Sequence, residues 1–258
     1  DLSDMEGLVA TAKRYYEWTD AQTPDVQGDG RALFGRDAMA NYMLIGSMQM
    51  GQEIFEVSDG KMTLHFDKAV ARRLWDNYYI PFVKGYFAAT GRFRSDDIKT
   101  GNIIAYVGST SGVSFFPEAV SVSDSESYPI EMDVLPCPKF EGGDYAVQQG
   151  AGMVVTKGEE PEIYASVEFL KWFTADERNI KFSMDSGYLP VTKTANSKEA
   201  IVGSGAQIRD SMLKTLNVGV DMVNDNEMYT TKAFEGGNKA RNILEYSLSD
   251  KAAADREI

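Results

Sequence analysis

The sequence has 258 residues, of which 43% are hydrophobic and 25% charged, the balance of a globular protein that can bury its own core. Acidic residues outnumber basic ones by 39 to 26, and the net charge of −13 argues against nucleic acid or anionic lipid as the main partner. The only cysteine, Cys137, excludes an intrachain disulfide, and the only histidine, His65, excludes a site built from several imidazoles. No apolar run approaches the about 20 residues of a membrane span.

The first third of the chain is predicted to be helical. Ser3 and Glu6 have the spacing of a capping box, so a first helix should start at Ser3, and a polar loop should follow it over residues 20–31. Polar caps and closing residues then predict two helices and a short capped turn: Asp37 to Gly51, Asp67 to the residue before Pro81, and Ser95 to Gly101.

The middle of the chain has the character of short strands. Residues 103–107 form an apolar run typical of a strand buried on both faces. Alternating apolar residues over 130–134 and the run 153–155 predict two more strands. The remaining 100 residues are predicted to be mainly helical, with helices that start near Pro161, at a capping box over 174–177, near Ile208 and near Asn238. The helix from Pro161 should turn Ile163, Val167 and Leu170 inward. Helices interleaved with short strands indicate an α/β fold rich in helix.

The usual enzyme motifs are missing or incomplete. There is no phosphate-binding P-loop, and the run 150–152 lacks the third glycine of a dinucleotide fingerprint. Residues 108–112 resemble a nucleophile elbow but have threonine at the central position, and the only histidine lies in an ordinary strand pattern. Cys137 lacks a basic neighbour in sequence, which indicates an inert thiol. Carboxylates are numerous, so a pair suited to glycoside hydrolysis stays open as an alternative.

Three features of the sequence could bind a ligand without catalysing a reaction. The loop 108–112 follows a buried strand, where α/β sheets place ligands, and offers the hydroxyls of Ser109 and Thr110; a serine–glycine turn without a ligand is the simpler alternative. Gly150, Ala151 and Gly152 leave room for close approach of a ligand. Trp18 follows a helix and precedes a polar loop, so its ring is a candidate to stack on a sugar, or else it belongs to the core.

The chain resembles the extracellular solute-binding proteins of sugar ABC importers. The run 149–155 reads like the glycine-rich hinge strand of that family, residues 165–174 like its following helix, and residues 186–191, GYLPV after a serine, like its next turn. Residues 134–136, 104–109 and 4–8 resemble the strand before the hinge, the strand and loop at the cleft, and a motif in which Met5 replaces the family's tryptophan. The resemblance spans nearly the whole chain and is most specific in its middle.

The resemblance implies a periplasmic-binding-protein-like type II fold with two lobes. Residues 1–148 would then form the first part of the second lobe, residues 149–197 the hinge and the returning segment of the first lobe, and residues 198–258 the closing helices of the second lobe. Family members have further strands and helices ahead of the segment that matches residues 4–8. We therefore expect the chain, which starts at Asp1, to lack the N-terminal part of the first lobe.

The resemblance also implies a function. The protein would capture a sugar or sugar-like solute in an interlobe cleft and deliver it to ABC permease subunits, as a monomer without enzymatic activity, cofactor or metal, in the periplasm or lipid-anchored on the outer face of the membrane. Ser109 and Thr110, the hinge residues Gly150, Ala151 and Gly152, and Tyr188 are the expected contacts, with Trp18 added from its own position. Tyr188 can instead be a packing residue next to Leu189. The alternatives are a carboxylate-based glycosidase of the α/β class and a surface interaction module with an exposed apolar patch.

Overall fold

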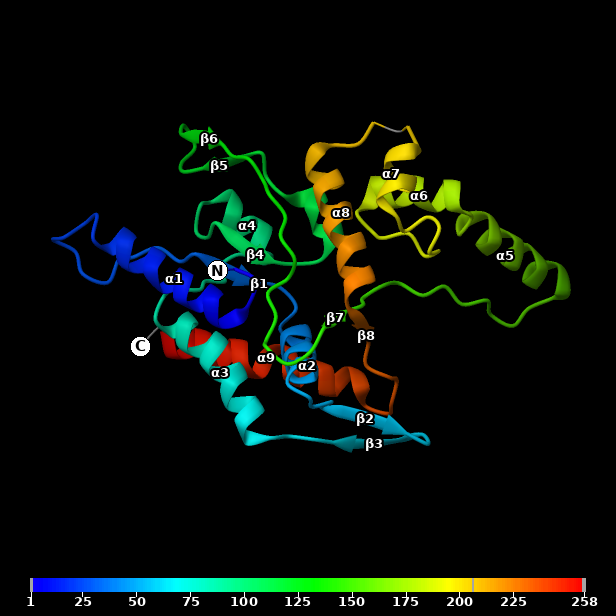
Figure 1. Ribbon diagram of the computed structural model, residues 1–258, viewed down its shortest axis with the longest axis horizontal. Coiled ribbons are helices and arrows are strands. Elements are labelled where there is room, and N and C mark those ends of the chain that lie inside the picture. The colour runs from blue at the N-terminus through cyan, green and yellow to red at the C-terminus, as the bar shows by residue number, and fades with distance from the viewer. Residues whose placement is uncertain (1, 206, 257–258) are drawn as a thin grey trace.

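The computed structural model describes residues 2–205 and 207–256. It consists of helices with four pairs of short strands between them (Figure 1). In chain order the elements are α1 (Met5–Asp20), β1 (Phe34–Arg36), α2 (Met39–Gln49), β2 (Phe55–Ser58), β3 (Lys61–Leu64), α3 (Lys68–Val83), α4 (Arg94–Lys99), β4 (Ala105–Val107), the 3-10 helix η1 (Thr110–Phe115), β5 (Ala119–Ser121), β6 (Ser127–Pro129), β7 (Tyr145–Val147), α5 (Glu160–Phe173), α6 (Asp176–Ser186), α7 (Lys198–Gly203), α8 (Asp210–Asp225), β8 (Glu227–Tyr229) and α9 (Gly237–Arg256).

The main core brings together the beginning and the end of the chain. Helices α1, α3 and α9 lie side by side next to the parallel pair β1–β4 (Figure 1). Met5 and Leu8 of α1, Leu74 of α3 and Leu248 of α9 are all buried in one cluster with Phe34 of β1. Burial of four or five such side chains stabilises the arrangement by roughly 1.5–3 kcal/mol each.

A second core surrounds α8. Met212 and Leu216 of α8 are buried against Ile180 of α6, Ile201 of α7 and Val113 of η1. Their spacing of four residues places the α8 side chains on one face of the helix, as the sequence predicts. Helices α6, α7 and α8 form the upper right part of the molecule in Figure 1.

Two of the crossings of the chain between the two cores pass through a parallel strand pair, and the segments on either side of η1 make two more. Tyr145 of β7 pairs with Glu227 of β8 and Val147 pairs with Tyr229, and the Gln148 amide continues the ladder to the Tyr229 carbonyl at 2.9 Å. After β7 the chain runs out to α5 and α6, and through α7 and α8 it returns to β8. The two strands therefore lie side by side where the chain leaves for α5 and where it returns from α8.

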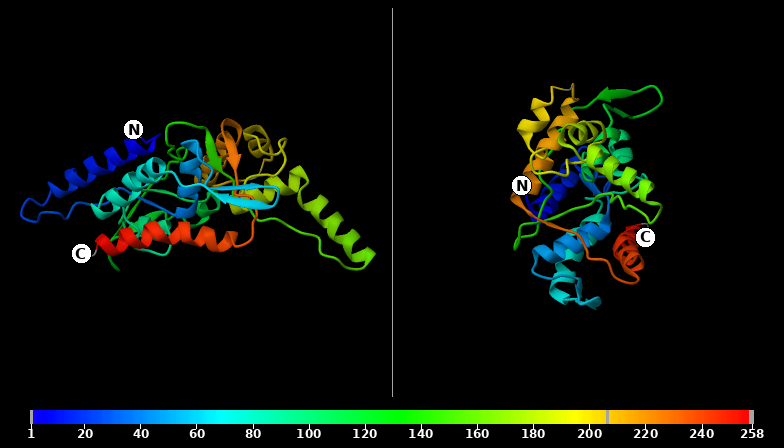
Figure 2. Two further views of the ribbon diagram at one scale, coloured as in Figure 1. Left: turned by 90° about the horizontal axis from the view of Figure 1, so that it is seen from below. Right: turned by 90° about the vertical axis from the view of Figure 1, so that its right-hand side faces the viewer.

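Helix α5 differs from its expected role. It protrudes from the molecule (Figures 1 and 2), and none of its residues is buried. The expected inward stripe at Ile163, Val167 and Leu170 is therefore wrong, because no element of residues 2–205 and 207–256 buries that face. Tyr164 is 67% exposed, and Trp172 is 53% exposed.

Several helix starts use other caps than those predicted. Helix α1 is capped by Asp4, whose side chain accepts a hydrogen bond from the Gly7 amide at 2.7 Å, and not by Ser3. The predicted capping box over 174–177 is also wrong. The N-cap of α6 is Ala175, and the Thr174 hydroxyl donates to the Leu170 carbonyl of the preceding helix.

The start of α2 is held by a residue from the far end of the chain. Ala38, with φ +55°, is the N-cap and supplies no side-chain bond. The amides of Met39 and Ala40 donate instead to the Glu245 carboxylate of α9, at 3.0 and 2.7 Å. Asp37, the predicted cap, turns away to Arg94, because Arg94 offers it both a backbone amide and a guanidinium.

Helix ends follow the sequence more closely. Gly51 and Gly187 have φ near +80° just after α2 and α6, as glycine C-terminal stops do. The Asp67 carboxylate caps α3 by accepting from the amides of Ala69 and Val70. Pro81 does not end α3, which continues to Val83.

Two of the three predicted strands are wrong. The run 130–134 and the run 153–155 are irregular, and Val154 is 85% exposed. A strand needs a neighbour to satisfy its backbone groups, and within residues 2–205 and 207–256 no strand pairs with either run. The third, 103–107, shortens to β4; Ile103 is buried, but Ile104 is exposed because only β1 pairs with it.

Cys137 and His65 have neighbours that sequence order conceals. Arg36 of β1 lies beside the half-buried Cys137, so the expectation that this thiol has no basic neighbour is wrong. Burial raises the thiol pKa and the Arg36 charge opposes this shift only in part, which keeps the thiol protonated. His65 follows β3 and its Nε2 lies 2.7 Å from the Glu56 carboxylate across the hairpin.

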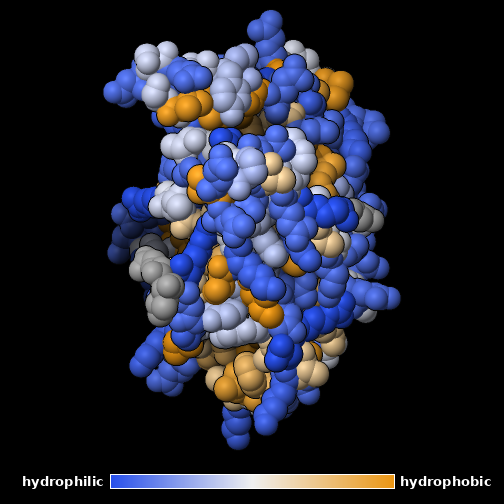
Figure 3. Space-filling view, turned by 90° about the vertical axis from the view of Figure 1, so that its left-hand side faces the viewer, coloured by the Kyte–Doolittle hydropathy of each residue, from blue (hydrophilic) through white to orange (hydrophobic). Residues whose placement is uncertain are grey.

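The surface near the end of α1 is mainly hydrophilic, with apolar residues in small separate groups (Figure 3). This agrees with the excess of acidic side chains in the sequence.

Candidate functional site

A groove of about 800 Å³ lies beside the β7–β8 connection. It is lined by α2, the first residue of β2, the end of β7 and the residues after it, the end of β8 and the residues after it, and the start of α9. It thus combines segments that are about 200 residues apart in sequence. We call it the hinge groove.

One wall of the hinge groove is apolar. Leu44 and Ile45 of α2 line it together with Phe55 of β2 and Phe234 from the loop before α9. The Phe55 and Phe234 rings pack at a centroid distance of 5.3 Å. Phe55 and Leu44 are anchored in a small core of their own, so this wall is held in place from behind.

The rest of the groove lining is rich in hydrogen-bonding groups. Gln148 and Gln149 follow β7, and Asn238 and Arg241 lie in the first turns of α9. The Arg241 guanidinium donates to the Asn41 side-chain oxygen of α2. An apolar wall with a few convergent polar groups is the usual composition of a small-molecule site.

Tyr229 at the end of β8 is a fixed part of the groove. Its hydroxyl donates to the Glu53 carboxylate at 3.0 Å. Burial, reinforced by this carboxylate, raises the Tyr229 pKa to about 12, so the phenol stays protonated at neutral pH.

The predicted hinge residues lie at or just beyond this groove. Gly150 lines it, and Ala151 and Gly152 continue from it as exposed, irregular chain. A Cβ added at Gly150 or Gly152 would meet no atom within 4 Å. Packing within the described chain therefore does not require glycine at either position.

Ser109, Thr110 and Tyr188 form a separate group. Thr110 starts η1, and the Ser109 hydroxyl lies 3.0 Å from that of Ser111. Gly187 sits so close to η1 that an added Cβ would be 2.7 Å from the Thr110 carbonyl oxygen, which brings Tyr188 to the same place. Tyr188 is 42% exposed and its ring packs on Phe182, at a centroid distance of 5.9 Å.

Asp37 connects the two groups through the β1–β4 pair. Because β1 and β4 are parallel, Asp37 and Gly108 follow them at the same sheet edge, and an added Cβ at Gly108 would be 3.4 Å from Asp37 Oδ2. Four residues further on, Asn41 reaches the hinge groove. The edge that carries Ser109 and the groove are thus joined by one short segment.

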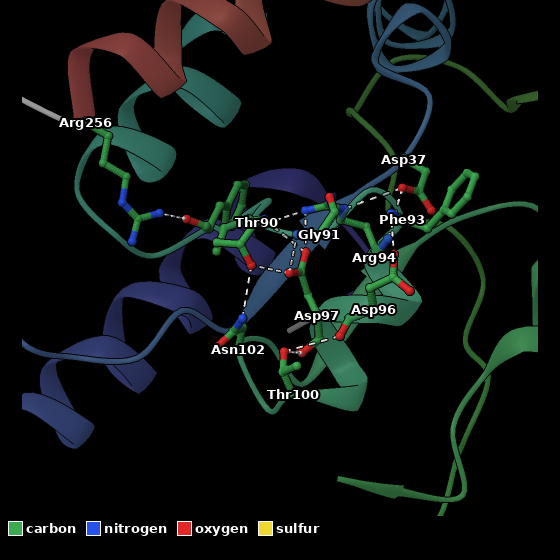
Figure 4. A network of polar contacts seen from close by, with 12 residues as sticks. Asp37, Thr90, Gly91, Phe93, Arg94, Asp96, Asp97, Thr100, Asn102 and Arg256 are labelled. Carbon is green, nitrogen blue, oxygen red and sulfur yellow. Dashed lines mark hydrogen bonds and ion pairs between the residues drawn. The ribbon is translucent and has the colours of Figure 1, made fainter. Parts of the chain in front are cut away.

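A buried polar network fixes this sheet edge (Figure 4). Arg94 Nη1 lies 2.5 Å from Asp97 Oδ2, and Arg94 Nε lies 3.5 Å from the Asp37 carboxylate. Asp97 also accepts from the amide of Gly91 at 2.8 Å and from the hydroxyl of Thr90. Desolvation raises the Asp37 pKa, and the hydrogen bond and charge of Arg94 oppose that rise.

Trp18 is not brought together with the other predicted residues. It lies in the last turn of α1, 62% exposed, with its ring 6.1 Å from that of Tyr15. The C-terminal end of α1 and helix α5 lie at opposite ends of the molecule (Figure 2).

Sequence reasoning missed the polar side chains that give the groove its character. Asn41 sits inside a predicted helix, and Arg241 lies 200 residues later in another, so no motif joins them. The pairing depends on α2 and α9 packing together, which neither helix reveals alone.

Among residues 2–205 and 207–256, no group of three or more histidine, cysteine, aspartate or glutamate side chains is arranged to hold a metal ion. In the same ranges, no helix has both the length and the apolar character needed to cross a membrane.

The sequence matches the family described as bacterial extracellular solute-binding protein over residues 1–206. No curated protein matches the chain. Among solved structures, a cyclic alpha-maltosyl-1,6-maltose binding protein from Arthrobacter globiformis superposes with a TM-score of 0.66 at 14% identity, over 100% of this chain and 63% of that protein. UgpB from Mycobacterium tuberculosis, solved with glycerophosphocholine, gives a TM-score of 0.59 at 18% identity, over 95% of this chain and 63% of that protein.

These likenesses show a helix-rich α/β fold of the periplasmic-binding-protein-like kind. The chain spans less than two thirds of the length of both structures. At such low identity the likeness concerns the fold and does not identify a solute.

Proposed function

Because this chain belongs to the family of bacterial extracellular solute-binding proteins, we propose that it captures a sugar or sugar-like solute in the hinge groove and delivers it to the permeases of an ABC importer. The observation that carries the proposal is the position of the groove, against two of the connections between the two cores. Gln149 and Gly150 of the proposed hinge segment line the groove together with residues of the proposed second lobe, so a solute bound there would contact both and favour closure.

The composition of the groove supports a sugar-like solute. The half-buried Phe234 ring supplies aromatic surface for the apolar face of a ring, and the side-chain amides of Gln148 and Gln149 supply donors and acceptors for hydroxyls. A groove of about 800 Å³ has room for a mono- or disaccharide-sized molecule.

We further propose that Gly150, Ala151 and Gly152 contact this solute through their backbone. The group of Ser109, Thr110 and Tyr188 would contact it from the sheet edge, on the other side of Asp37. Trp18 lies apart from both groups, so it could stack only on a second solute molecule bound elsewhere.

The division of the chain follows the same proposal. Residues 1–148 and 198–258 would belong to the second lobe and residues 149–197 to the hinge and first lobe. The family implies a location outside the cytoplasm; the choice between periplasm and a lipid anchor, and the monomeric state, belong to the proposal.

The proposed role needs no catalysis, and the family and the two similar structures are binding proteins. A carboxylate-based glycosidase needs two carboxyl groups facing one pocket. Among the described residues, no aspartate or glutamate lines the hinge groove.

Calorimetry of the full gene product with a panel of mono- and disaccharides tests the proposal. We expect at least one sugar to bind with a Kd below about 100 μM, and Gln149→Ala to weaken that binding at least threefold. Gln149 lines the groove and is exposed. Gln27→Ala in the exposed loop before β1 is the matched control and should leave affinity unchanged. Absence of binding heat from every sugar, or equal losses in both variants, would contradict the proposal.

A further inference from the structure

We infer that the solute of the hinge groove carries an oxyanion, such as the phosphate or carboxylate of a substituted polyol or sugar. This inference rests on the proposed function, because it concerns the solute of the same groove. It follows from the charges of the groove, which are opposite in sign to those of the chain as a whole.

Three cationic side chains line the hinge groove: Lys232 from the loop after β8, and Lys239 and Arg241 from the start of α9. In the described part of the chain, no carboxylate lines it. Elsewhere the balance is reversed, since the sequence holds 39 acidic and 26 basic residues. A groove with positive charge on a strongly negative molecule concentrates anions locally and is unfavourable for cations.

Two carboxylates on elements that border the groove, Glu245 and Glu53, accept hydrogen bonds within the fold. Glu245 lies one turn beyond Arg241 on α9, and both of its oxygens accept backbone amides from the start of α2. Glu53 accepts the hydroxyl of Tyr229. Glu235 is exposed in the loop before α9 and is not part of the groove wall. Hydrogen bonds from neutral donors leave Glu245 and Glu53 negatively charged, so these two residues offset part of the field, while the described lining of the groove itself holds three cations and no carboxylate.

Arg241 is held in a position to bind an anion. One of its terminal nitrogens donates to the Asn41 oxygen, which is itself buried in α2. That bond orients the planar guanidinium and leaves its other N–H groups for a solute, and a guanidinium can bind phosphate or carboxylate with two parallel hydrogen bonds.

The start of α9 adds to the same field. Gly236, Gly237 and Asn238 line the groove next to Lys239, so the positive end of the dipole of this 20-residue helix faces the same space. The helix end strengthens binding by the cationic side chains and does not form a site without them.

Lys232 and Lys239 have different surroundings, which provides a useful comparison. The Lys232 ammonium donates to the Val57 carbonyl at 3.2 Å and thereby also ties the loop to β2. Lys239 is exposed and lies on the groove wall. Lys239→Gln is therefore the variant that removes charge with the smallest structural effect.

Calorimetry with matched pairs of solutes tests the inference. The probes are glycerol, glucose and inositol, each compared with its monophosphate, and inorganic phosphate alone. We expect at least one monophosphate to bind at least tenfold more tightly than its neutral partner. This preference should fall with rising ionic strength, because the charges are partly open to solvent.

Substitutions in the hinge groove test whether the preference for the phosphorylated solute arises there. Lys239→Gln should reduce the preference for the phosphorylated member at least threefold, and Arg241→Gln at least tenfold, without weakening the neutral member to the same extent. Lys61→Gln in the exposed β2–β3 hairpin is the matched control and should change neither affinity. A melting temperature measured for each variant shows whether it is folded.

The outcomes separate this inference from the proposed function. If a neutral sugar binds as tightly as its phosphate, the inference is wrong and the proposed function stands. If no probe binds, both are contradicted. If a phosphate binds more tightly but Lys239→Gln and Arg241→Gln, both folded, keep the full preference, the anion does not bind in the hinge groove and the inference is likewise overturned.

Discussion

Asp97 is expected to be among the most sensitive positions in the molecule. It is 1% exposed and takes its hydrogen bonds from Thr90, Gly91 and the guanidinium of Arg94 (Figure 4). Replacing it with alanine leaves the positive charge of Arg94, itself 4% exposed, without its closest partner. Removal of one member of a buried ion pair costs about 3–5 kcal/mol.

That loss is large against the total stability of such a domain. A globular domain unfolds at a free-energy cost of about 5–15 kcal/mol. For a chain of this size, 1 kcal/mol corresponds to about 2–4 °C in Tm, so Asp97→Ala should lower Tm by roughly 6–20 °C. The Asp37 carboxylate near Arg94 Nε compensates only in part, because it lies 3.5 Å away.

Urea unfolding followed by circular dichroism measures this cost. The matched control is Asp76→Ala on α3, which breaks an exposed pair with Arg72 and should cost less than about 0.5 kcal/mol. A cycle with Arg94→Met, Asp97→Ala and the double variant isolates the pair, and we expect a coupling energy of about 2–3 kcal/mol. Equal costs at Asp97 and Asp76, or additive single variants in the cycle, would refute the reasoning.

Three further predictions concern helix ends and pH. Glu245→Ala should lower the free energy of unfolding in urea by about 1–2 kcal/mol, since it removes the acceptor of two α2 amides; no change would mean that water replaces the cap. Gly187→Ala should cost more than about 1 kcal/mol in the same assay, because φ is +76° and the new Cβ would lie 2.7 Å from a backbone oxygen of η1. Hydrogen bonds from Lys251 and Tyr79 hold the Asp255 pKa below its ordinary value of 3.8, so this carboxylate stabilises the fold above pH 3.8 and loses its effect as the pH falls through the lowered pKa. The stability of Asp255→Asn should therefore fall less than that of the wild type on acidification below pH 3.8 in a melting series; parallel curves would show that Asp255 has no such role.

The local signals in the sequence determine helices well in this chain. Asp67 caps α3, and Gly51 and Gly187 end their helices with positive φ, because a cap or a left-handed glycine acts through its own backbone neighbours. The family resemblance was confirmed by the match over residues 1–206.

The features that could not be predicted from the sequence depend on residues far away in the chain. The cap of α2 comes from Glu245, more than 200 residues away, and the basic neighbour of Cys137 comes from β1. The run 153–155 has the composition of a strand but no strand beside it in the described chain. Pattern alone does not supply partners of this kind, because they arise only from the packed fold.

In the candidate site, too, some residues could be predicted from the local sequence and others could not. Gly150 could be found from the sequence because glycines next to a predicted strand are conspicuous, and it lines the hinge groove. Asn41 and Arg241 could not, since each is an ordinary polar residue on a helix and only the contact between α2 and α9 brings them together. Whether the residues predicted from the family resemblance contact a solute stays a prediction.

A crystal structure of the full gene product with its tightest-binding solute would test the account most directly. We predict that the solute lies in the hinge groove against Phe234, with an oxyanion within about 3.2 Å, the usual hydrogen-bond range, of the Arg241 guanidinium. A solute bound elsewhere, with the hinge groove filled only by water, would contradict the central claim.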